Sequence, residues 1–171
     1  MKNMTGKSLL EALLCLALIS IFSSVTIPAI GLSLENQRRQ SATIQMLGVL
    51  KFARGQAVFG RQKVSICHGS VNCERTGDWS QQLLVFSDIN GNGLLDGTDT
   101  VLRAESIGHE IYWKWAGLRS TQYLQFEPDG TTLAFNGTFT LCHEGKPFKQ
   151  IVINIAGRMR TQPPSSPTSC S

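Results

Sequence analysis

The chain has 171 residues, of which 42% are hydrophobic, and its 16 basic and 12 acidic side chains give a net charge of +4. This length suits a single domain with a modest apolar core. The small positive charge weakly indicates an anionic partner, since net charge bears on association and not on fold. The sequence contains no nucleophile elbow, glycine-rich phosphate loop or metalloprotease motif, so we do not expect an enzyme.

The N-terminal segment combines a short polar leader with a long apolar run. Residues 1–5 are followed by Gly6, and residues 12–34 include no charged side chain. A run of this length is enough to cross the hydrocarbon core of a membrane as one helix. Glu11 lies just before it, and a carboxylate in a membrane segment is costly and needs a partner. A secretory signal would place its cleavage site after the apolar run, whereas Gly6 precedes it.

This order resembles the class III leader of type IV pilins and type II secretion pseudopilins. The resemblance implies that a prepilin peptidase removes residues 1–6 and that the new N-terminus, Lys7, is methylated. Counted from Lys7, Glu11 and Pro28 occupy positions at which the family has Glu and often Pro, while Lys7 departs from the usual Phe or Met. Residues 7–34 would then form a transmembrane and assembly helix in the inner membrane, with a periplasmic head, 35–171, that is later displayed on a pilus. The alternative is a simple membrane anchor with Glu11 at the interface.

Residues 35–60 are expected to continue the helix, and short strands are expected to follow it. Ile44, Leu47, Leu50 and Val58 lie close to helical spacing and predict the face that packs on the rest of the head. Beyond the helix, runs rich in β-branched and aromatic residues alternate with clusters of Gly, Asp, Asn and Pro. These runs are 63–67, 82–86, 100–104, 123–126, 138–142 and 150–155. One long helix followed by antiparallel strands predicts an α+β fold with the helix packed on the sheet.

The order of several short motifs resembles the FimT/GspH group of minor pilins and pseudopilins over nearly the whole chain. The matching segments are 64–67 (Val-Ser-Ile-Cys), 84–88 (Leu-Val-Phe-Ser-Asp), 126–130 (Phe-Glu-Pro-Asp-Gly) and 153–158 (Ile-Asn-Ile-Ala-Gly-Arg). The resemblance implies the type IV pilin fold and other pilin subunits as partners.

Four of the five cysteines, Cys67, Cys73, Cys142 and Cys170, lie in the region that we place outside the cytoplasm. Disulfides are expected there, and four cysteines allow three pairings. The short gap between Cys67 and Cys73 indicates a local loop clip, which leaves Cys142 to pair with Cys170 and to pin a tail, 162–168, that is rich in Pro and Ser. A zinc site is the weaker alternative, because no CxxC pair is present.

Residues 88–99 have the spacing of a calcium-binding loop. The oxygen ligands would come from Asp88, Asn90, Asn92, the Leu94 carbonyl, Asp96 and Asp99, with Gly93 at the sharp turn. The last ligand is Asp instead of the longer Glu, and the flanking segments indicate strands instead of helices. The alternative is a structural hairpin loop in which Asn and Asp side chains bond to the backbone.

The segment Gly157-Arg158-Met159-Arg160 follows a strongly apolar strand. Residues two apart share a face of an extended strand, and guanidinium groups bind phosphates in a bidentate fashion. This GRxR motif resembles the FimT branch, in which it is associated with DNA binding during natural transformation. Lys146 and Lys149, expected in the loop before the strand, would add to the same patch. The alternatives are solvated arginines, or ion pairs with Glu144 or a neighbouring subunit.

Trp113 and Trp115 flank Lys114 in an apparent strand and predict a packed core edge; the alternative is a stacking platform for bases. Two functions remain for the chain as a whole. One is a minor pilin that binds double-stranded DNA and supports its uptake. The other is a structural or priming subunit, of a pilus or of a type II secretion pseudopilus, whose arginines contact other subunits. Calcium is the only cofactor that the sequence indicates.

Overall fold

The computed structural model describes residues 9–108, 111–119, 122–165 and 170, and the chain divides into two compact units after Arg38. Helix α1, Leu9–Gly60, contributes to both units. Gly6 and Lys7, the residues of the expected cleavage site, lie outside the described residues. Glu11 is in the first turn of α1 and is exposed.

In the first unit, apolar side chains of α1 such as Leu10, Leu14 and Ile19 are exposed. Across the part of the chain that the structure describes, no helix combines the length and the apolar character that a membrane crossing requires.

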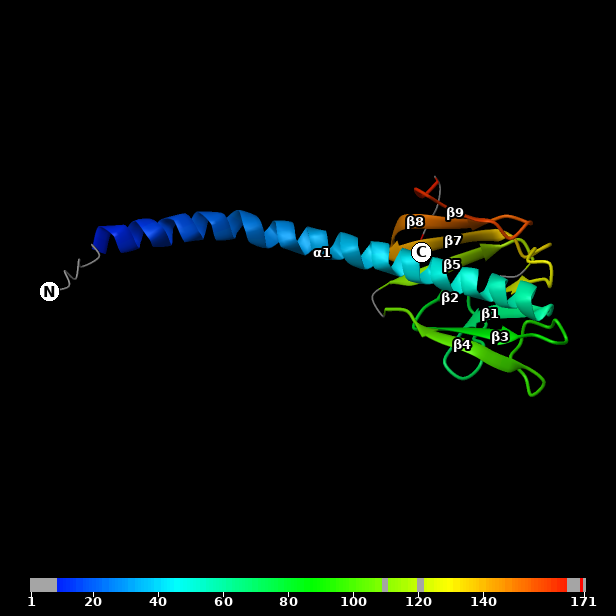
Figure 1. The fold of residues 1–171 in the computed structure, drawn as a ribbon. Coiled ribbons are helices and arrows are strands. Elements are labelled where there is room, and N and C mark those ends of the chain that lie inside the picture. The colour runs from blue at the N-terminus through cyan, green and yellow to red at the C-terminus, as the bar shows by residue number, and fades with distance from the viewer. Residues whose placement is uncertain (1–8, 109–110, 120–121, 166–169, 171) are drawn as a thin grey trace. The chain divides into compact units, whose positions relative to one another are not determined.

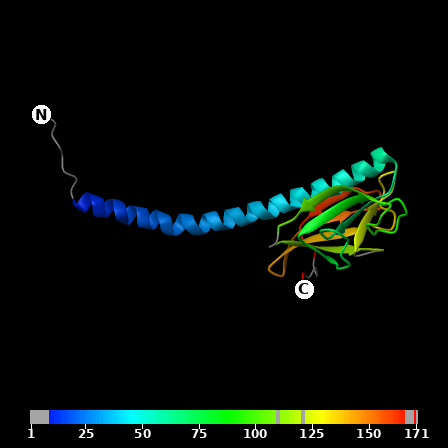
Figure 2. The same cartoon turned by 90° about the horizontal axis from the view of Figure 1, so that it is seen from below.

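The second unit contains two antiparallel sheets, and the part of α1 from residue 39 onward packs against them (Figure 1 and Figure 2). The first sheet has the strand order β4-β3-β1-β6, and the second has the order β2-β5-β7-β8-β9. The strands are β1 Val64–His68, β2 Asp78–Trp79, β3 Gln82–Ser87, β4 Thr100–Ser106, β5 Tyr112–Gly117, β6 Tyr123–Phe126, β7 Gly137–His143, β8 Lys146–Ile153 and β9 Met159–Gln162. The predicted α+β fold, with a helix packed on antiparallel strands, is confirmed.

The face of α1 that packs on the sheets matches the predicted one only in part, because Leu50 is buried and Leu47 packs against the core. Met46, Val49, Leu50, Ala53 and Ala57 are fully buried and follow the i, i+3, i+4, i+7, i+11 spacing of one helical face. Two residues of the predicted face are exposed instead, Ile44 at 70% and Val58 at 47%. The prediction is wrong at these two positions, and it did not include the two buried alanines, Ala53 and Ala57. Their small side chains let the helix approach the sheets closely but give a weak apolar signal in the sequence.

An aromatic cluster fills the core of the second sheet. Trp79, Trp113 and Phe139 are fully buried, and Trp115 is 2% exposed. The Phe139 ring stacks on Trp115 at 4.2 Å between centroids and meets Trp79 edge-on at 4.9 Å. Trp113 and Trp115 are therefore core residues, in agreement with the predicted packed core edge. The alternative, a base-stacking platform at these two positions, is wrong.

The six strands predicted from the sequence correspond to β1, β3, β4, β6, β7 and β8, and the tryptophan segment corresponds to β5. Strand β8 begins earlier than expected, so Lys146 and Lys149 belong to the strand and not to the loop before it. Pro147 obscures this start in the sequence, because proline disfavours strands. It is accommodated opposite Cys142, next to a register shift between Leu141 and Cys142.

Two disulfides join the cysteines in the pairing that the spacing predicts. Cys67 is bonded to Cys73 and Cys142 to Cys170, so these four residues are not zinc ligands. The first disulfide closes a short loop after β1. Its Cys67 packs with Leu84 and Phe86 in a second, smaller apolar cluster. The second ties the tail to β7, where the Tyr112 hydroxyl also donates a hydrogen bond to the Cys170 carbonyl.

A cationic groove between helix α1 and the β8–β9 turn

The GRxR motif begins in a tight turn between β8 and β9. The Gly157 N–H donates to the Asn154 carbonyl at 2.8 Å, and the Asn154 N–H donates to the Arg158 carbonyl at 3.1 Å. The Asn154 side chain accepts the Arg158 N–H at 2.9 Å. Gly157 has a φ of 69°, in the left-handed region that favours glycine. The glycine of the motif is thus required by the backbone of the turn.

Arg54 of α1 fixes this turn in place. Its Nε donates to the Gly130 carbonyl at 2.9 Å, and its Nη2 donates to the Ala156 carbonyl at 3.2 Å. A Cβ atom at Gly157 would lie 2.1 Å from the Gly130 carbonyl oxygen, so the two backbone segments are in close contact. One arginine therefore holds together the helix, the turn near Gly130 and the turn that carries Arg158.

A groove of about 850 Å³ lies between this turn and α1. Its lining residues are Lys51, Arg54, Gly55, Val58, Phe59, Asp129, Gly157, Arg158 and Met159. Three of them are cations and one is an acid. Hydrogen bonds from the Thr131 backbone N–H and hydroxyl lower the pKa of Asp129, so this acid is ionised at neutral pH. The lining still carries an excess of two positive charges.

Arg158 and Arg160 are both exposed, and neither guanidinium has an ion-pair or hydrogen-bond partner within the described residues. No ion pair joins Glu144 to either of them in that part of the chain. Both arginines flank the half-buried Met159, and that they share one face stays a prediction. Arg158 precedes β9 and lines the groove, whereas Arg160 lies within β9 opposite Val152 and is not part of the lining.

Lys146 and Lys149 do not extend the groove. Lys146 pairs with His143 at the end of β8 far from Arg160, whose partner is Val152. The six-residue separation along β8 corresponds to about 20 Å, and the three residues from Lys149 to Val152 to about 10 Å. The expectation that these lysines join the same patch is wrong for Lys146, because the strand extends further than its sequence indicates.

The sequence does not indicate that Lys51 and Arg54 belong to this site. They are three residues apart on a helix and so lie on neighbouring parts of its surface, a pattern that is also typical of a solvated helix face. Only the packing of α1 beside the β8–β9 turn brings them next to Arg158. The sequence does show two basic residues near the end of the helix. Nothing in it links them to the GRxR motif, which lies about a hundred residues later.

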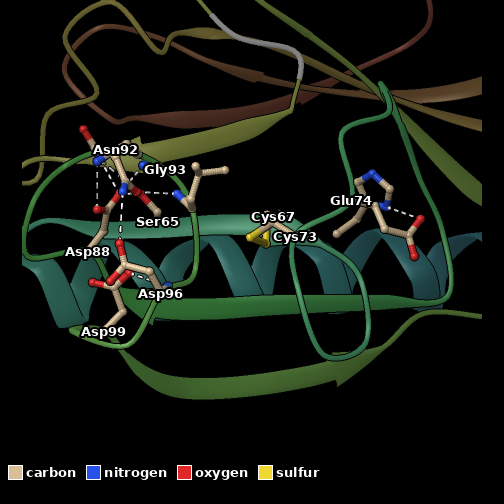
Figure 3. Close-up of a disulfide and its surroundings, with 12 residues drawn as sticks. Ser65, Cys67, Cys73, Glu74, Asp88, Asn92, Gly93, Asp96 and Asp99 are labelled. Carbon is tan, nitrogen blue, oxygen red and sulfur yellow. Dashed lines mark hydrogen bonds and ion pairs between the residues drawn. A yellow bond between two sulfur atoms is a disulfide. The ribbon is translucent and has the colours of Figure 1, made fainter.

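The candidate calcium loop is a separate feature, between β3 and β4 (Figure 3). Asp88 is fully buried, and its carboxylate accepts hydrogen bonds from Ser65 Oγ at 2.6 Å and Gln125 Nε2 at 2.7 Å. It also accepts hydrogen bonds from the backbone N–H groups of Asn92 at 3.0 Å and Gly93 at 2.9 Å. Asp88 thus anchors the loop to β1 and β6 from inside.

The remaining acids of the loop bond to its own backbone and amides. Asp96 accepts from Thr98, Asn90 and Asn92, and these hydrogen bonds, led by that of the Thr98 hydroxyl, hold its pKa well below the usual range. Asp99 accepts the N–H groups of Ile89 and Asp96. Among the described residues, no group of three or more His, Cys, Asp or Glu is arranged to hold a metal ion. The contacts are those of the structural hairpin loop, and calcium binding stays a prediction.

The fold defines the class of protein: an N-terminal helix packed on antiparallel sheets is the type IV pilin fold. The chain is similar to two crystal forms of the type IV minor pilin FimU of Pseudomonas aeruginosa. One is 25% identical with a TM-score of 0.63, covering 80% of this chain and 98% of that chain. The other is 26% identical with a TM-score of 0.59, covering 77% and 99%.

Residues 42–157 match the family model described as type II transport protein GspH, and the chain belongs to this family. No curated protein matches the chain. Together, the family and the fold identify a type IV minor pilin or pseudopilin, as the sequence motifs predicted.

Proposed function

We propose that this minor pilin binds double-stranded DNA through the β8–β9 turn and supports DNA uptake in natural transformation. The observation that carries the proposal is the exposure of Arg158 and Arg160, whose guanidinium groups have no partner among the described residues. In an unpaired arginine all N–H donors of the planar guanidinium group are free, so the group can bind a phosphate in bidentate fashion.

The surroundings of Arg158 support an anionic ligand. Lys51 is exposed on the opposite side of the groove, and the excess of positive charge in the lining attracts a polyanion. Contacts to phosphates carry no direct sequence information, so binding is expected to be similar for duplexes of different sequence. Lys146 and Lys149 are expected to matter less, since they lie further along β8 and are point charges without the planar fork.

Fluorescence anisotropy with a labelled duplex and the full chain in detergent tests this proposal. Replacing both Arg158 and Arg160 by Gln should weaken binding at least tenfold, by about equal factors for unrelated duplexes. The matched control is the double variant Arg75→Gln/Arg119→Gln, which removes the same charge from two exposed arginines outside the groove. Equal binding by the two double variants would refute a specific role of the turn.

The second candidate function is a structural or priming subunit, of a pilus or of a type II secretion pseudopilus, that does not bind DNA. The match to a family described as type II transport protein favours it, as does the similarity to a minor pilin. In this case Arg158 and Arg160 contact acidic groups of adjacent subunits. If the chain binds no duplex even at low salt, while Arg158→Glu abolishes its copurification with other pilins, this second function is correct.

Either function requires assembly, for which we propose the usual pilin route. Prepilin peptidase would cut after Gly6, residues 7–34 would anchor the chain in the inner membrane, and Glu11 would pair with the N-terminal ammonium of an adjacent subunit. Gly6→Val should therefore leave an uncut precursor, which mass spectrometry detects. Glu11→Ala should insert in the membrane but fail to enter filaments, because a buried ammonium without its carboxylate is costly. Normal processing of the first variant or normal incorporation of the second would contradict the respective role.

A further inference from the structure

Phe59 is the most unusual residue in the lining of the groove. Its side chain is 90% exposed, although it lies within helix α1, one position before the end of the helix. No aromatic or cationic partner contacts its ring in the part of the chain that the structure describes. An exposed phenylalanine beside Lys51 and Arg158 places a flat apolar face next to two cations that also have no partner there.

This combination is typical of sites for single-stranded nucleic acid, where a positively charged groove follows the backbone and an aromatic side chain stacks on a base. A duplex cannot use such a platform, since its base faces are covered by their neighbours in the stack. The groove, of about 850 Å³, is open to solvent, so an unstacked base can reach the exposed Phe59 ring from outside.

We propose that the groove binds a single-stranded DNA segment, such as a frayed end, with one base stacked on Phe59 and the flanking phosphates on Lys51 and Arg158. This inference rests on the proposed DNA-binding function and deepens it by naming the form of DNA that the groove takes. Arg54 acts here as a positioning residue, because two of its donors are used by the Gly130 and Ala156 carbonyls. Arg160, outside the groove, serves the duplex and not the stacked base.

The test compares two strands that differ only in their bases. One is an oligothymidine, and the other is an abasic strand of the same length with the same phosphates. The full chain in detergent should bind the oligothymidine about tenfold more tightly, in line with the stacking of one base on an aromatic ring. Phe59→Ala should remove this preference and bind both strands like the abasic one. Leu118→Ala is the matched control, since Leu118 is 76% exposed but lies outside the groove, and it should keep the preference.

A second variant reports on stacking directly. The native tryptophans, Trp79, Trp113 and Trp115, are all buried, so the indole introduced by Phe59→Trp has a distinct solvent-exposed emission. Oligothymidine should quench this emission and shield it from iodide, whereas the abasic strand should leave it accessible.

The outcomes separate this inference from the function on which it rests. If Phe59→Ala keeps the preference for bases, or the wild type shows none, the stacking proposal is wrong even if duplex binding depends on Arg158 and Arg160. If Phe59→Ala binds both strands as the wild type does but no longer copurifies with other pilins, Phe59 is a subunit contact instead. Failure of the chain to bind any DNA would overturn both proposals.

Discussion

Arg54 donates a hydrogen bond from Nε to the carbonyl oxygen of Gly130 at 2.9 Å, and so joins helix α1 to the turn that follows β6. Its second bond, to the Ala156 carbonyl at 3.2 Å, extends the same link to the β8–β9 turn. The position of Arg158 therefore depends on a side chain that does not belong to its motif.

Arg54→Gln should lower the free energy of unfolding by about 1–2 kcal/mol, because the shorter amide cannot reach both carbonyls. It should also weaken DNA binding by displacing Arg158. Lys51→Gln is the control for charge, since Lys51 is exposed and unpaired among the described residues, and its stability should change by less than about 0.5 kcal/mol. Urea denaturation measures both. Equal stabilities of the two variants would show that the Arg54 hydrogen bonds do not hold the turn.

Gly157→Ala should destabilise the head more than Gly145→Ala. Both glycines have nearly the same φ, 69° and 71°, so an added Cβ meets the same backbone penalty at each. Around Gly145 there is open space, whereas at Gly157 the Cβ would lie 2.1 Å from the Gly130 carbonyl oxygen. We expect the Gly157 variant to lose about 2 kcal/mol more in denaturant titrations. Similar losses would mean that the turn can move away from Gly130 at little cost.

Most of the fold could be predicted from the sequence because its strands are rich in β-branched and aromatic residues and are separated by turn residues. The exceptions have physical reasons. The packed face of α1 includes Ala53 and Ala57, which are weak signals of burial. Strand β9 carries Arg160 and the neighbouring polar residues Thr161 and Gln162. Among the described residues it is the end strand of its sheet, next to β8, so it lacks the apolar alternation of an inner strand.

The candidate site was predicted in part. The motif at 157–160 is local, and its glycine and arginines can be read directly from the chain. The groove depends on tertiary contacts between α1 and the β8–β9 turn, which no local pattern specifies. For the same reason the role of Asp88 was missed: its partners Ser65 and Gln125 lie on β1 and β6, and their sequence contexts do not indicate a buried carboxylate.

Asp88→Ala should lower the free energy of unfolding by about 3 kcal/mol in the absence of calcium. The substitution leaves the buried donors of Ser65, Gln125 and Gly93 without their acceptor, and unsatisfied buried groups are costly. Asp99→Ala is the milder comparison, because Asp99 is exposed and accepts two backbone N–H groups. Thermal denaturation in a chelator should give the larger loss for Asp88→Ala, and an equal loss would contradict the anchoring role.

The wild type and Asp99→Ala also test calcium binding. If residues 88–99 bind the ion, millimolar calcium should raise the melting temperature of the wild type, because a ligand specific to the folded state stabilises it. Asp99→Ala should reduce this rise. If calcium leaves the wild-type melting temperature unchanged, the prediction of a metal site is wrong and the loop is structural.

The disulfide Cys142–Cys170 should contribute more stability than Cys67–Cys73. The sequence separations are 28 and 6 residues. The chain-entropy relation then gives contributions of about 3.6 and about 2.2 kcal/mol. Each pair is replaced by Ala; Cys67 and Cys142 are equally buried, whereas Cys170 is more buried than Cys73. The unfolding free energies of the two double variants provide the measurement, and a larger loss for the shorter loop would contradict the entropic reason.

The central claim is that Arg158 and Arg160 bind DNA phosphates, and the salt dependence of duplex binding tests it most directly. Each phosphate contact releases condensed counterion, so log K should fall linearly with log salt for the wild type. The variant Arg158→Gln/Arg160→Gln should flatten this slope by roughly two units, one for each lost contact, while Arg75→Gln/Arg119→Gln should leave it unchanged. An identical slope and affinity for the wild type and the Arg158/Arg160 variant would contradict the claim, and the chain would then be a structural pilin subunit.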